Sequence, residues 1–557
     1  MKSSSQRSAK IDNHHLSRRS FIGTTAAGGA ALLTGGLASL LKESAGAGTN
    51  FPFVEMSIMQ LQAAMAAGQL SAKDLVQGYL NRIQQLNPTL HAVIETNPNA
   101  IATANSLDKE RKGGQVRGPL HGIPILVKDN IATLDNLQTT AGSLALYNAR
   151  VPADAPLIQR LRAAGAIILG KTNLSEWANI RSAHSVSGWS AIGGLVKNPN
   201  VLDRNACGSS SGSGAAVAAS LAAAAVGTET DGSLVCPGSV NGIVSLKPTV
   251  GLVSRTYVIP ISHNQDTPGP MGRTVADVAA LLTAMAGSDS ADHATRDANI
   301  HRMDYVAAIA HASLKGKRIG VAHADSTPAT DEDRLFDRAI AAMKSAGAVI
   351  VPIRFTPPDP KSSGDAELLE LETELKADLN AYLATTPPTV KARTLRDVVA
   401  FDNANPRETA LFGQDIFLAA EKTKGLSDPA YLKARALLLR ISRADGLDHI
   451  LGSYKIHALV MPTDEPAWRV DVIKGDNDSS NTSFLPAVAG YPHLTVPMGY
   501  IRDLPVGISF IGRAWSEATL LVVGAAFESA TRARHAPTYI PSEESTVPVS
   551  AALAPLH

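Results

Sequence analysis

The sequence has few cysteines, few aromatic residues and no excess of charge of either sign. Two cysteines in 557 residues, Cys207 and Cys236, cannot form a disulfide framework, and we expect two free thiols. The 51 basic residues are balanced by 50 acidic ones, and a net charge of +1 provides no field that would hold nucleic acid. No His or Cys clusters have the spacing of a zinc site, so neither a metal nor another cofactor is expected.

Apolar residues make up 45% of the chain and aromatic residues 4%, a composition that predicts a large globular protein with a core. Short apolar runs of strand length alternate with amphipathic stretches that predict helices. This alternation predicts an α/β architecture. The predicted strands are Ile123–Val127, Ala166–Leu169, Ile243–Leu246, Arg318–Val321, Ala348–Val351 and Ala458–Met461.

Several helices are predicted from signals at their ends. A capping box at Ser71–Asp74 begins a helix that Asn87-Pro88 should end. A second helix should begin at Thr274–Asp277 and reach Ala286, and a third should run over Asp333–Ala346. Residues 366–439 are more charged and largely helical in pattern, so we interpret them as a helical insertion beside the sheet.

Residues 1–47 have the form of a twin-arginine export signal. Arg18 and Arg19 lie within S-R-R-S-F-I, and no charge follows from Phe21 to Leu41. We predict that the twin-arginine export machinery recognises this segment and that its removal leaves a periplasmic or secreted protein without a stable membrane anchor. A retained transmembrane anchor is the alternative, because the uncharged stretch is just long enough to span a bilayer.

No linker divides the rest of the chain. We predict one domain over residues 48–535, followed by a flexible tail at 536–557, which is rich in Pro and Ser.

The residues that could carry chemistry concentrate in two loops and one strand end. Cys207–Gly214 reads C-G-S-S-S-G-S-G and Gly227–Pro237 reads G-T-E-T-D-G-S-L-V-C-P; the uncharged, Ala-rich stretch Ala215–Val226 between them predicts a buried helix. Upstream, Lys128 ends the apolar strand of H-G-I-P-I-L-V-K-D-N. Burial at a strand end lowers a lysine pKa because it disfavours the ammonium form, and a neutral amine can act as a base.

Other interpretations of single residues are weaker. Ser210 is the central serine of a G-x-S-x-G motif, but the residues before it are turn-like, whereas a nucleophile elbow requires a strand there. Gly227–Ser233 resembles part of a phosphate-binding loop without its lysine. Cys236 has no histidine partner nearby, which favours a buried apolar role over thiol catalysis. A solvated loop accounts for a group that looks like metal ligands: Asp289, Asp292, His293, Asp297 and His301. Two tryptophans near the loops either line an acyl pocket or pack: Trp177 and Trp189.

Together, the motifs resemble the amidase signature family over Phe51–Arg534. The family's lysine corresponds to Lys128, its bridging serine to Ser209 and its nucleophilic serine to Ser233. Further matching segments are G-K-T-N at 170–173, G-I-V-S-L-K-P-T at 242–249 and D-T-P-G-P-M at 266–271. Within the family, the chain is most similar to bacterial peptide amidases through T-E-T-D-G-S at 228–233 and N-L-S-E-W-A-N at 173–179.

The resemblance implies a fold and a mechanism. The fold would be a single large mixed β-sheet covered by helices on both faces. Neutral Lys128 would take a proton from Ser209, and Ser209 one from Ser233, which would attack the amide carbonyl to give an acyl-enzyme. Backbone N–H groups would form the oxyanion hole, and the peptide bond before the bridging serine would be cis. The residues of this hole would be Thr230, Asp231, Gly232 and Ser233.

The implied activity is hydrolysis of carboxylic amides with release of ammonia, and C-terminal peptide amides are the favoured substrates. Three departures from the family pattern put other substrates in doubt: Cys207 and Ser211 replace glycines of the bridging loop, and Asp231 replaces the first glycine of G-G-S. The alternatives are a general aliphatic or aryl amidase, an amidotransferase component that uses aminoacyl-tRNA, and an inactive relative that only binds ligand. The absence of a basic field disfavours the RNA substrate, and the presence of all three active residues disfavours the inactive relative.

Overall fold

The computed structural model describes residues 53–322, 328–477 and 482–555. Phe53–His557 forms one compact unit. The predicted export signal at 1–47 lies outside the described residues. None of the described helices is both long and apolar enough to cross a membrane.

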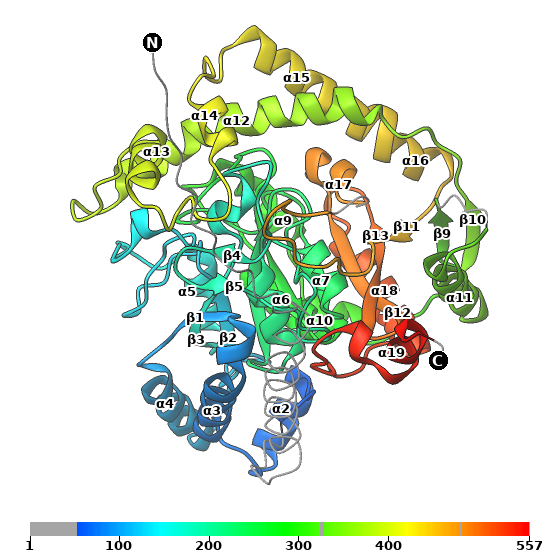
Figure 1. Cartoon of the computed structure of the whole chain (residues 1–557). Coiled ribbons are helices and arrows are strands. Elements are labelled where there is room, and N and C mark those ends of the chain that lie inside the picture. Colours follow the sequence, from blue (N-terminus) through cyan, green and yellow to red (C-terminus); the bar gives the residue numbers. More distant parts are fainter. Residues whose placement is uncertain (1–52, 323–327, 478–481, 556–557) are drawn as a thin grey trace, which may run out of the picture. The chain divides into compact units, whose positions relative to one another are not determined.

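The described residues form one large sheet and a two-stranded ribbon. The strands are β1 (Val93–Thr96), β2 (Pro124–Lys128), β3 (Ile167–Thr172), β4 (Trp189–Ser190), β5 (Gly194–Leu195), β6 (Ala224–Glu229), β7 (Val244–Lys247), β8 (Thr267–Gly272), β9 (Arg318–Val321), β10 (Val349–Pro352), β11 (Ala458–Pro462), β12 (His493–Ile501) and β13 (Leu504–Ile511). The large sheet has eleven strands in the order β1-β3-β2-β6-β8-β7-β12-β13-β11-β9-β10, and β4 pairs with β5 (Figure 1).

The large sheet is mixed, as predicted. Strand β2 runs parallel to β3 and β6, and β9 runs parallel to β10 and β11. The other neighbouring pairs are antiparallel, including β6 with β8. All six predicted strands are present, each shifted by no more than a few residues. The predicted α/β fold built on one mixed sheet is therefore confirmed.

Helices pack against this sheet and against one another. They are α2 (Ile58–Ala66), α3 (Ala72–Leu90), α4 (Ala100–Lys112), α5 (Pro156–Ala163), α6 (Ser211–Ala218), α7 (Val235–Val240), α8 (Val275–Met285), α9 (Ala298–His301), α10 (Tyr305–Ile309), α11 (Asp331–Ser345), α12 (Pro360–Thr385), α13 (Leu395–Ala404), α14 (Asp415–Ala420), α15 (Pro429–Leu439), α16 (Asp448–Ser453), α17 (Phe484–Ala489), α18 (Glu517–Thr531) and α19 (Val547–Leu553).

The structure confirms the helix-start signals but not one of the stop signals. Ser71 and Thr274 close the capping boxes of α3 and α8, as predicted. Pro88, however, lies inside α3, which continues to Leu90. A proline this close to the end removes only one N–H donor, and the helix ends where His91 adopts a left-handed conformation (φ 51°).

The predicted Ala-rich helix over Ala215–Val226 is wrong beyond Ala218. Helix α6 ends at Ala218, Ser220 turns the chain with φ 54°, and β6, a strand that is buried along its whole length, begins at Ala224. Strand β6 pairs with β2 on one side and β8 on the other. Tertiary pairing in the middle of the sheet thus overrides the helix propensity of alanine.

Residues 366–439 are largely helical, as the pattern indicated, and contain most of α12 and all of α13–α15. Figure 1 shows α12 and α15 extending along the top of the unit, opposite α2–α4 at the bottom. Leu379 of α12 is buried in one hydrophobic cluster with Leu395 of α13 and Phe417 of α14. We call α12–α14 the cap.

The start of the segment predicted to be a flexible tail, 536–557, is attached to the unit. The Tyr539 N–H donates to Pro199 O (2.9 Å), Thr538 donates to Asn200 O (2.9 Å), and Ile540 forms a bridge with Val201. These bonds hold residues 538–540 in place, since their backbone partners lie in the buried 199–202 segment.

Candidate active site

Lys128 is the last residue of β2, and its side chain is completely buried. Its amine donates to the Ser209 hydroxyl at 2.7 Å and to Thr228 Oγ1 at 2.9 Å. It also lies 3.1 Å from Ser210 Oγ and 3.2 Å from the Thr228 carbonyl. Burial lowers the pKa of Lys128 to about 7, and the carboxylates of Asp266 and Glu229 oppose this shift only in part.

Ser209 lies in the loop before α6, where the Gly208–Ser209 peptide bond is cis. Its carbonyl accepts the Ser175 N–H at 3.1 Å. The adjacent hydroxyl of Ser210 donates to the Thr228 carbonyl (3.0 Å) and accepts the Thr228 N–H (3.2 Å). Ser210 thus joins the loop to β6, and its engaged hydroxyl does not suit the nucleophile-elbow interpretation.

Ser233 lies in the tight turn that leads from β6 into α7, and it lines a cavity. Its carbonyl accepts the Ser210 N–H at 3.2 Å, which joins the two serine loops. Gly232 has φ +78°, a conformation that glycine adopts without strain. Among the described residues, the N–H groups of Asp231, Gly232 and Ser233 donate to no protein acceptor. They are available to a ligand oxygen.

Three residues that sequence analysis did not assign support this arrangement. Glu229 accepts the N–H groups of Leu234 (2.7 Å) and Val235 (3.1 Å), the first after the Ser233 turn. Thr228 Oγ1 accepts from the amide of Asn130 (2.9 Å) as well as from the lysine. The only signal in the sequence was their position inside the T-E-T-D-G-S and V-K-D-N motifs.

Asp266 connects the turn at residues 230–233 to a neighbouring loop. It accepts from the Thr230 hydroxyl at 2.6 Å through one oxygen and from two backbone N–H groups, those of Ile261 and Ser262, through the other. Burial raises the pKa of Asp266 to about 6, while these hydrogen bonds oppose the shift. Thr230 is therefore fixed through its side chain.

The Asp231 side chain connects this turn to the cap. Its carboxyl forms hydrogen bonds with Ser483 and with Glu367 of the cap. Burial and the Asp231 charge raise the pKa of Glu367 well above its usual range, and Glu367 also accepts from Gln265 at 2.9 Å. Glu367 is thus the protonated partner and donates to Asp231.

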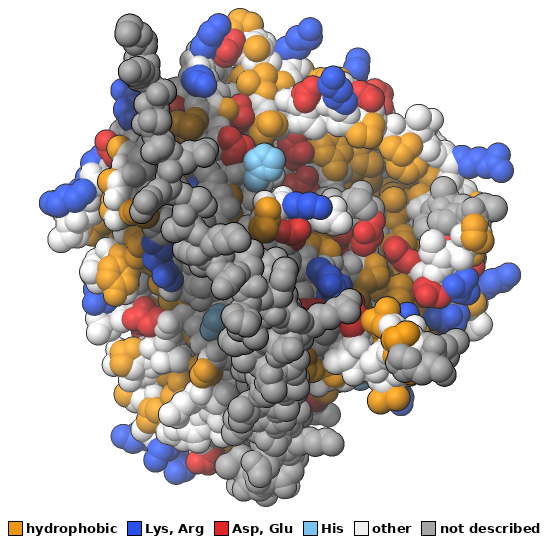
Figure 2. Space-filling model, in the orientation of Figure 1, with side chains coloured by type: hydrophobic (Ala, Val, Ile, Leu, Met, Phe, Trp, Pro, Cys, Tyr) orange, Lys and Arg blue, Asp and Glu red, His pale blue; other side chains and the backbone are white. Residues whose placement is uncertain are grey.

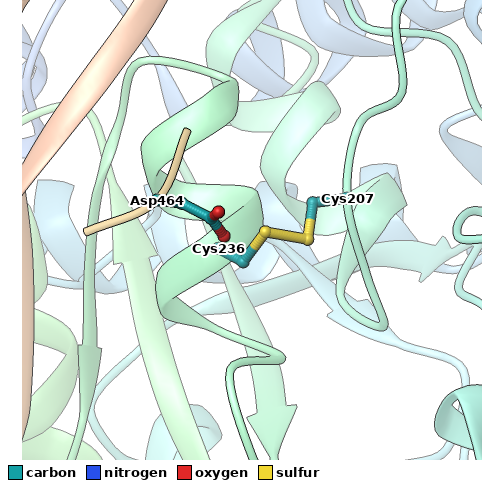
Figure 3. Close-up of side chains that lie close together, drawn as sticks. All are labelled: Cys207, Cys236 and Asp464. Atoms are coloured by element: carbon teal, nitrogen blue, oxygen red, sulfur yellow. A yellow bond between two sulfur atoms is a disulfide. The ribbon is translucent and has the colours of Figure 1, made fainter. Parts of the chain in front are cut away.

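The two cysteines form a disulfide, so the prediction of two free thiols is wrong (Figure 3). Their Cα atoms are 6.0 Å apart, although 29 residues separate them in the chain. The count of two excluded a framework of several bridges but not a single bridge between segments that β6 brings together. Cys236 is buried, as expected, and the Asp464 carboxylate lies beside the bridge (Figure 3).

The cavity at Ser233 has a volume of about 370 Å³. The disulfide and the turn at residues 230–233 form part of its wall, and the cap contributes Leu371 and Ile416. Trp177 and Trp189 do not line it. They pack edge-on against Phe417 and Phe412, with ring centroids 6.0 and 5.3 Å apart.

Two of the loop residues that resembled metal ligands join their loop to residues 254–255 of a neighbouring loop. Asp292 forms an ion pair with Arg255 at 2.6 Å, and Asp289 accepts from Ser254 at 2.7 Å. Among the described residues, two groups of Cys, His, Asp or Glu side chains bring their ligand atoms close enough together to hold one ion. The first is the disulfide with Asp464. In the second, the Nδ1 atom of His263 is 2.9 Å from a carboxylate oxygen. This cluster is His263, Glu374 and Asp378.

The chain matches the profile of the Amidase family over residues 74–521. The solved structure of native peptide amidase from Stenotrophomonas maltophilia is 48% identical with a TM-score of 0.82, covering 88% of this chain and 99% of that one. A probable amidase from Arabidopsis thaliana is 40% identical over 503 residues, 88% of this chain and 93% of the relative. A glutamyl-tRNA(Gln) amidotransferase subunit from Symbiobacterium thermophilum is 32% identical over 488 residues, 86% of this chain and 97% of the relative.

Proposed function

This chain belongs to the Amidase family and is an amidase; from that premise we propose that it is a serine hydrolase that releases ammonia from carboxylic amides through an acyl-enzyme. The observation that carries the proposal is the buried Lys128 amine, 2.7 Å from the Ser209 hydroxyl. A lysine whose pKa is about 7 is substantially neutral at neutral pH and can accept a proton.

The proposed reaction proceeds in two halves. Lys128 takes a proton from Ser209 as Ser209 takes one from Ser233, and the Ser233 oxygen attacks the carbonyl carbon. The N–H groups of the 231–233 turn stabilise the oxyanion. The lysine returns its proton through Ser209 to the leaving nitrogen, the C–N bond breaks, and ammonia departs. Water then loses a proton by the same route and attacks the acyl-enzyme. The bond from the acyl carbon to the Ser233 oxygen breaks, the lysine returns the proton to that oxygen through Ser209, and the acid departs.

C-terminal peptide amides are the proposed substrate class. The support is the 48% identity to the peptide amidase of Stenotrophomonas maltophilia over nearly its whole length. A general aliphatic or aryl amidase is the first alternative. An amidotransferase role is the second, because the Symbiobacterium thermophilum relative is 32% identical. Against it, acidic and basic side chains are interspersed on the face shown in Figure 2, and no broad basic area is visible outside the grey atoms.

The test is ammonia release from peptide amides, free amino-acid amides and aryl amides. We expect the highest kcat/KM for N-acylated peptide amides, and we expect Ser233→Ala to abolish release. A fluorophosphonate probe should label wild type but not this variant. Absence of labelling together with absence of hydrolysis would instead favour the ligand-binding interpretation, and ammonia transfer to misacylated tRNA would favour the amidotransferase.

We also propose that the chain is exported through the twin-arginine pathway. The Cys207–Cys236 disulfide supports this proposal, because disulfides persist in oxidising compartments and are rare in the cytosol. Fractionation of cells that express the full chain should find the protein outside the cytoplasm, shortened at its N-terminus. Replacing Arg18 and Arg19 by Lys should retain it inside; unchanged export of that variant would contradict the proposal.

A further inference from the structure

The disulfide joins the two segments that carry the proposed catalytic serines. Cys207 lies two residues before Ser209, and Cys236 lies three residues after Ser233, in the first turn of α7. Both cysteines line the active-site cavity, with exposed fractions of 5% and 4%. The bridge therefore fixes the separation of the Ser209 loop from the helix that follows Ser233.

Cys207 has a backbone conformation that disfavours a side chain. Its φ is 52°, in the left-handed region, where a Cβ lowers the population roughly tenfold relative to glycine. Glycine occupies the corresponding position in the amidase signature pattern that this loop resembles. In this chain a non-glycine residue keeps the same turn immediately before the Gly208–Ser209 pair.

Two contacts hold Cys207 in this turn. Its N–H donates to Asn205 Oδ1 at 2.7 Å, and its sulfur is bonded to Cys236. The hydrogen bond fixes the entry to the turn. The covalent bond fixes the direction of the side chain, and with it the φ angle.

Resting on the proposed function, we infer that the Cys207–Cys236 bridge is a positioning device for catalysis. It holds Cys207 in the left-handed conformation and so keeps the Ser209 hydroxyl within hydrogen-bond distance of the Lys128 amine. A phosphine or dithiol reductant would supply two electrons and break the bridge to give two thiols, with two protons taken up from water or the dithiol. Cys207 would then relax, and Ser209 would move away from the amine.

The loss expected on reduction is partial. Ser210 N–H to Ser233 O and Ser175 N–H to Ser209 O also hold the loop, and neither depends on the sulfur atoms. The relaxation of Cys207 alone corresponds to about a tenfold fall in the population with Ser209 in place. It should appear in kcat rather than in KM, since the proton relay is disturbed more than the cavity.

Two double variants test the inference, because they remove the same sulfur atoms and differ only in the backbone freedom of residue 207. One is Cys207→Gly with Cys236→Ala, and the other is Cys207→Ala with Cys236→Ala. Each is compared with wild type, with and without tris(2-carboxyethyl)phosphine, for kcat and KM on a peptide amide. Thiol titration reports reduction, and circular dichroism reports folding.

We expect reduction to lower the kcat of wild type about tenfold, with recovery on reoxidation, and to change KM less than about threefold. The Gly variant should have a kcat about tenfold above that of the Ala variant, neither variant should respond to the reductant, and the Ala variant should match reduced wild type. Full kcat in completely reduced wild type, or equal kcat in the two variants, would overturn the inference. If the Ala variant does not fold, comparison of the kcat of reduced wild type with that of the Gly variant still tests the inference.

These outcomes are distinct from failure of the proposed function. Failure of the function would appear as no hydrolysis and no fluorophosphonate labelling of oxidised wild type. Failure of this inference alone would appear as hydrolysis that does not respond to reduction.

Discussion

The pH dependence of hydrolysis tests the role of the lysine most directly. Burial lowers the pKa of Lys128 to about 7, and catalysis needs the neutral amine. The kcat/KM should therefore rise with pH through about 7 and level off above about 8. At pH 5 about 1% of the amine would be neutral, so kcat/KM should be about 100-fold below its plateau. A lysine with the usual pKa of about 10.4 would still give a tenfold rise per pH unit at pH 9.

The variant Asp266→Asn shows which group produces the rise of kcat/KM with pH, the acid limb of the profile. Asp266 is also in the site, and burial raises its pKa to about 6, so it could itself titrate in this range. Its carboxylate raises the pKa of Lys128, because a negative charge favours the ammonium form. Removing that charge should move the limb to lower pH if the limb belongs to the lysine. If it belongs to Asp266, the limb should disappear.

The assay is ammonia release from an N-acetylated amino-acid amide between pH 5 and 9 at substrate concentrations well below KM. Circular dichroism at each pH separates titration of the site from unfolding. A flat wild-type profile between pH 5 and 8 would refute the reasoning, as would a limb that moves to higher pH in Asp266→Asn.

Three further predictions concern the serine loops. Alanine at Lys128, Ser209 or Ser233 should lower kcat by about 10⁴-fold or more with unchanged circular dichroism, and activity near wild type in any of them would contradict the relay. Glu229→Ala leaves two buried N–H groups without an acceptor and should lower the free energy of unfolding by roughly 2–5 kcal/mol. Glu229→Gln keeps an acceptor oxygen and should have a melting temperature closer to that of wild type. Equal melting temperatures of the two variants would count against the role of Glu229 as the acceptor. Gly232→Ala adds a Cβ at φ +78° and 3.1 Å from Ser483 Oγ, which should shift the 231–233 turn and lower kcat at least about tenfold. An unchanged kcat would exclude this turn as the oxyanion-binding element.

Much of the fold was predictable because its local signals agree with its tertiary structure. The six predicted strands are apolar runs that end at polar or turn residues, and the capping boxes at Ser71 and Thr274 satisfy N–H groups that are exposed in any helix start. Such signals depend on neighbours in sequence. They remain valid whatever the rest of the chain does.

Two central strands were not predictable for the opposite reason. Strand β6 begins as A-A-V after a run of alanines, and β8 reads T-P-G-P-M-G, which by itself is typical of a turn. Pro268 and Pro270 are tolerated because β7 pairs only with Met271 and Gly272, beyond both prolines. The neighbouring strands decide both cases, and these lie far away in sequence.

The same distinction applies to the site. The motifs identified Lys128, Ser209 and Ser233, and the structure brings Lys128 and Ser209 into contact and joins the Ser233 turn to the same loop. The protonation state of the amine is a different matter. It follows from complete burial, opposed by the charges of Asp266 and Glu229, and neither quantity can be read from the V-K-D motif. A relative with the same three residues but without this burial would have a charged lysine and, by the same reasoning, a slower reaction at neutral pH.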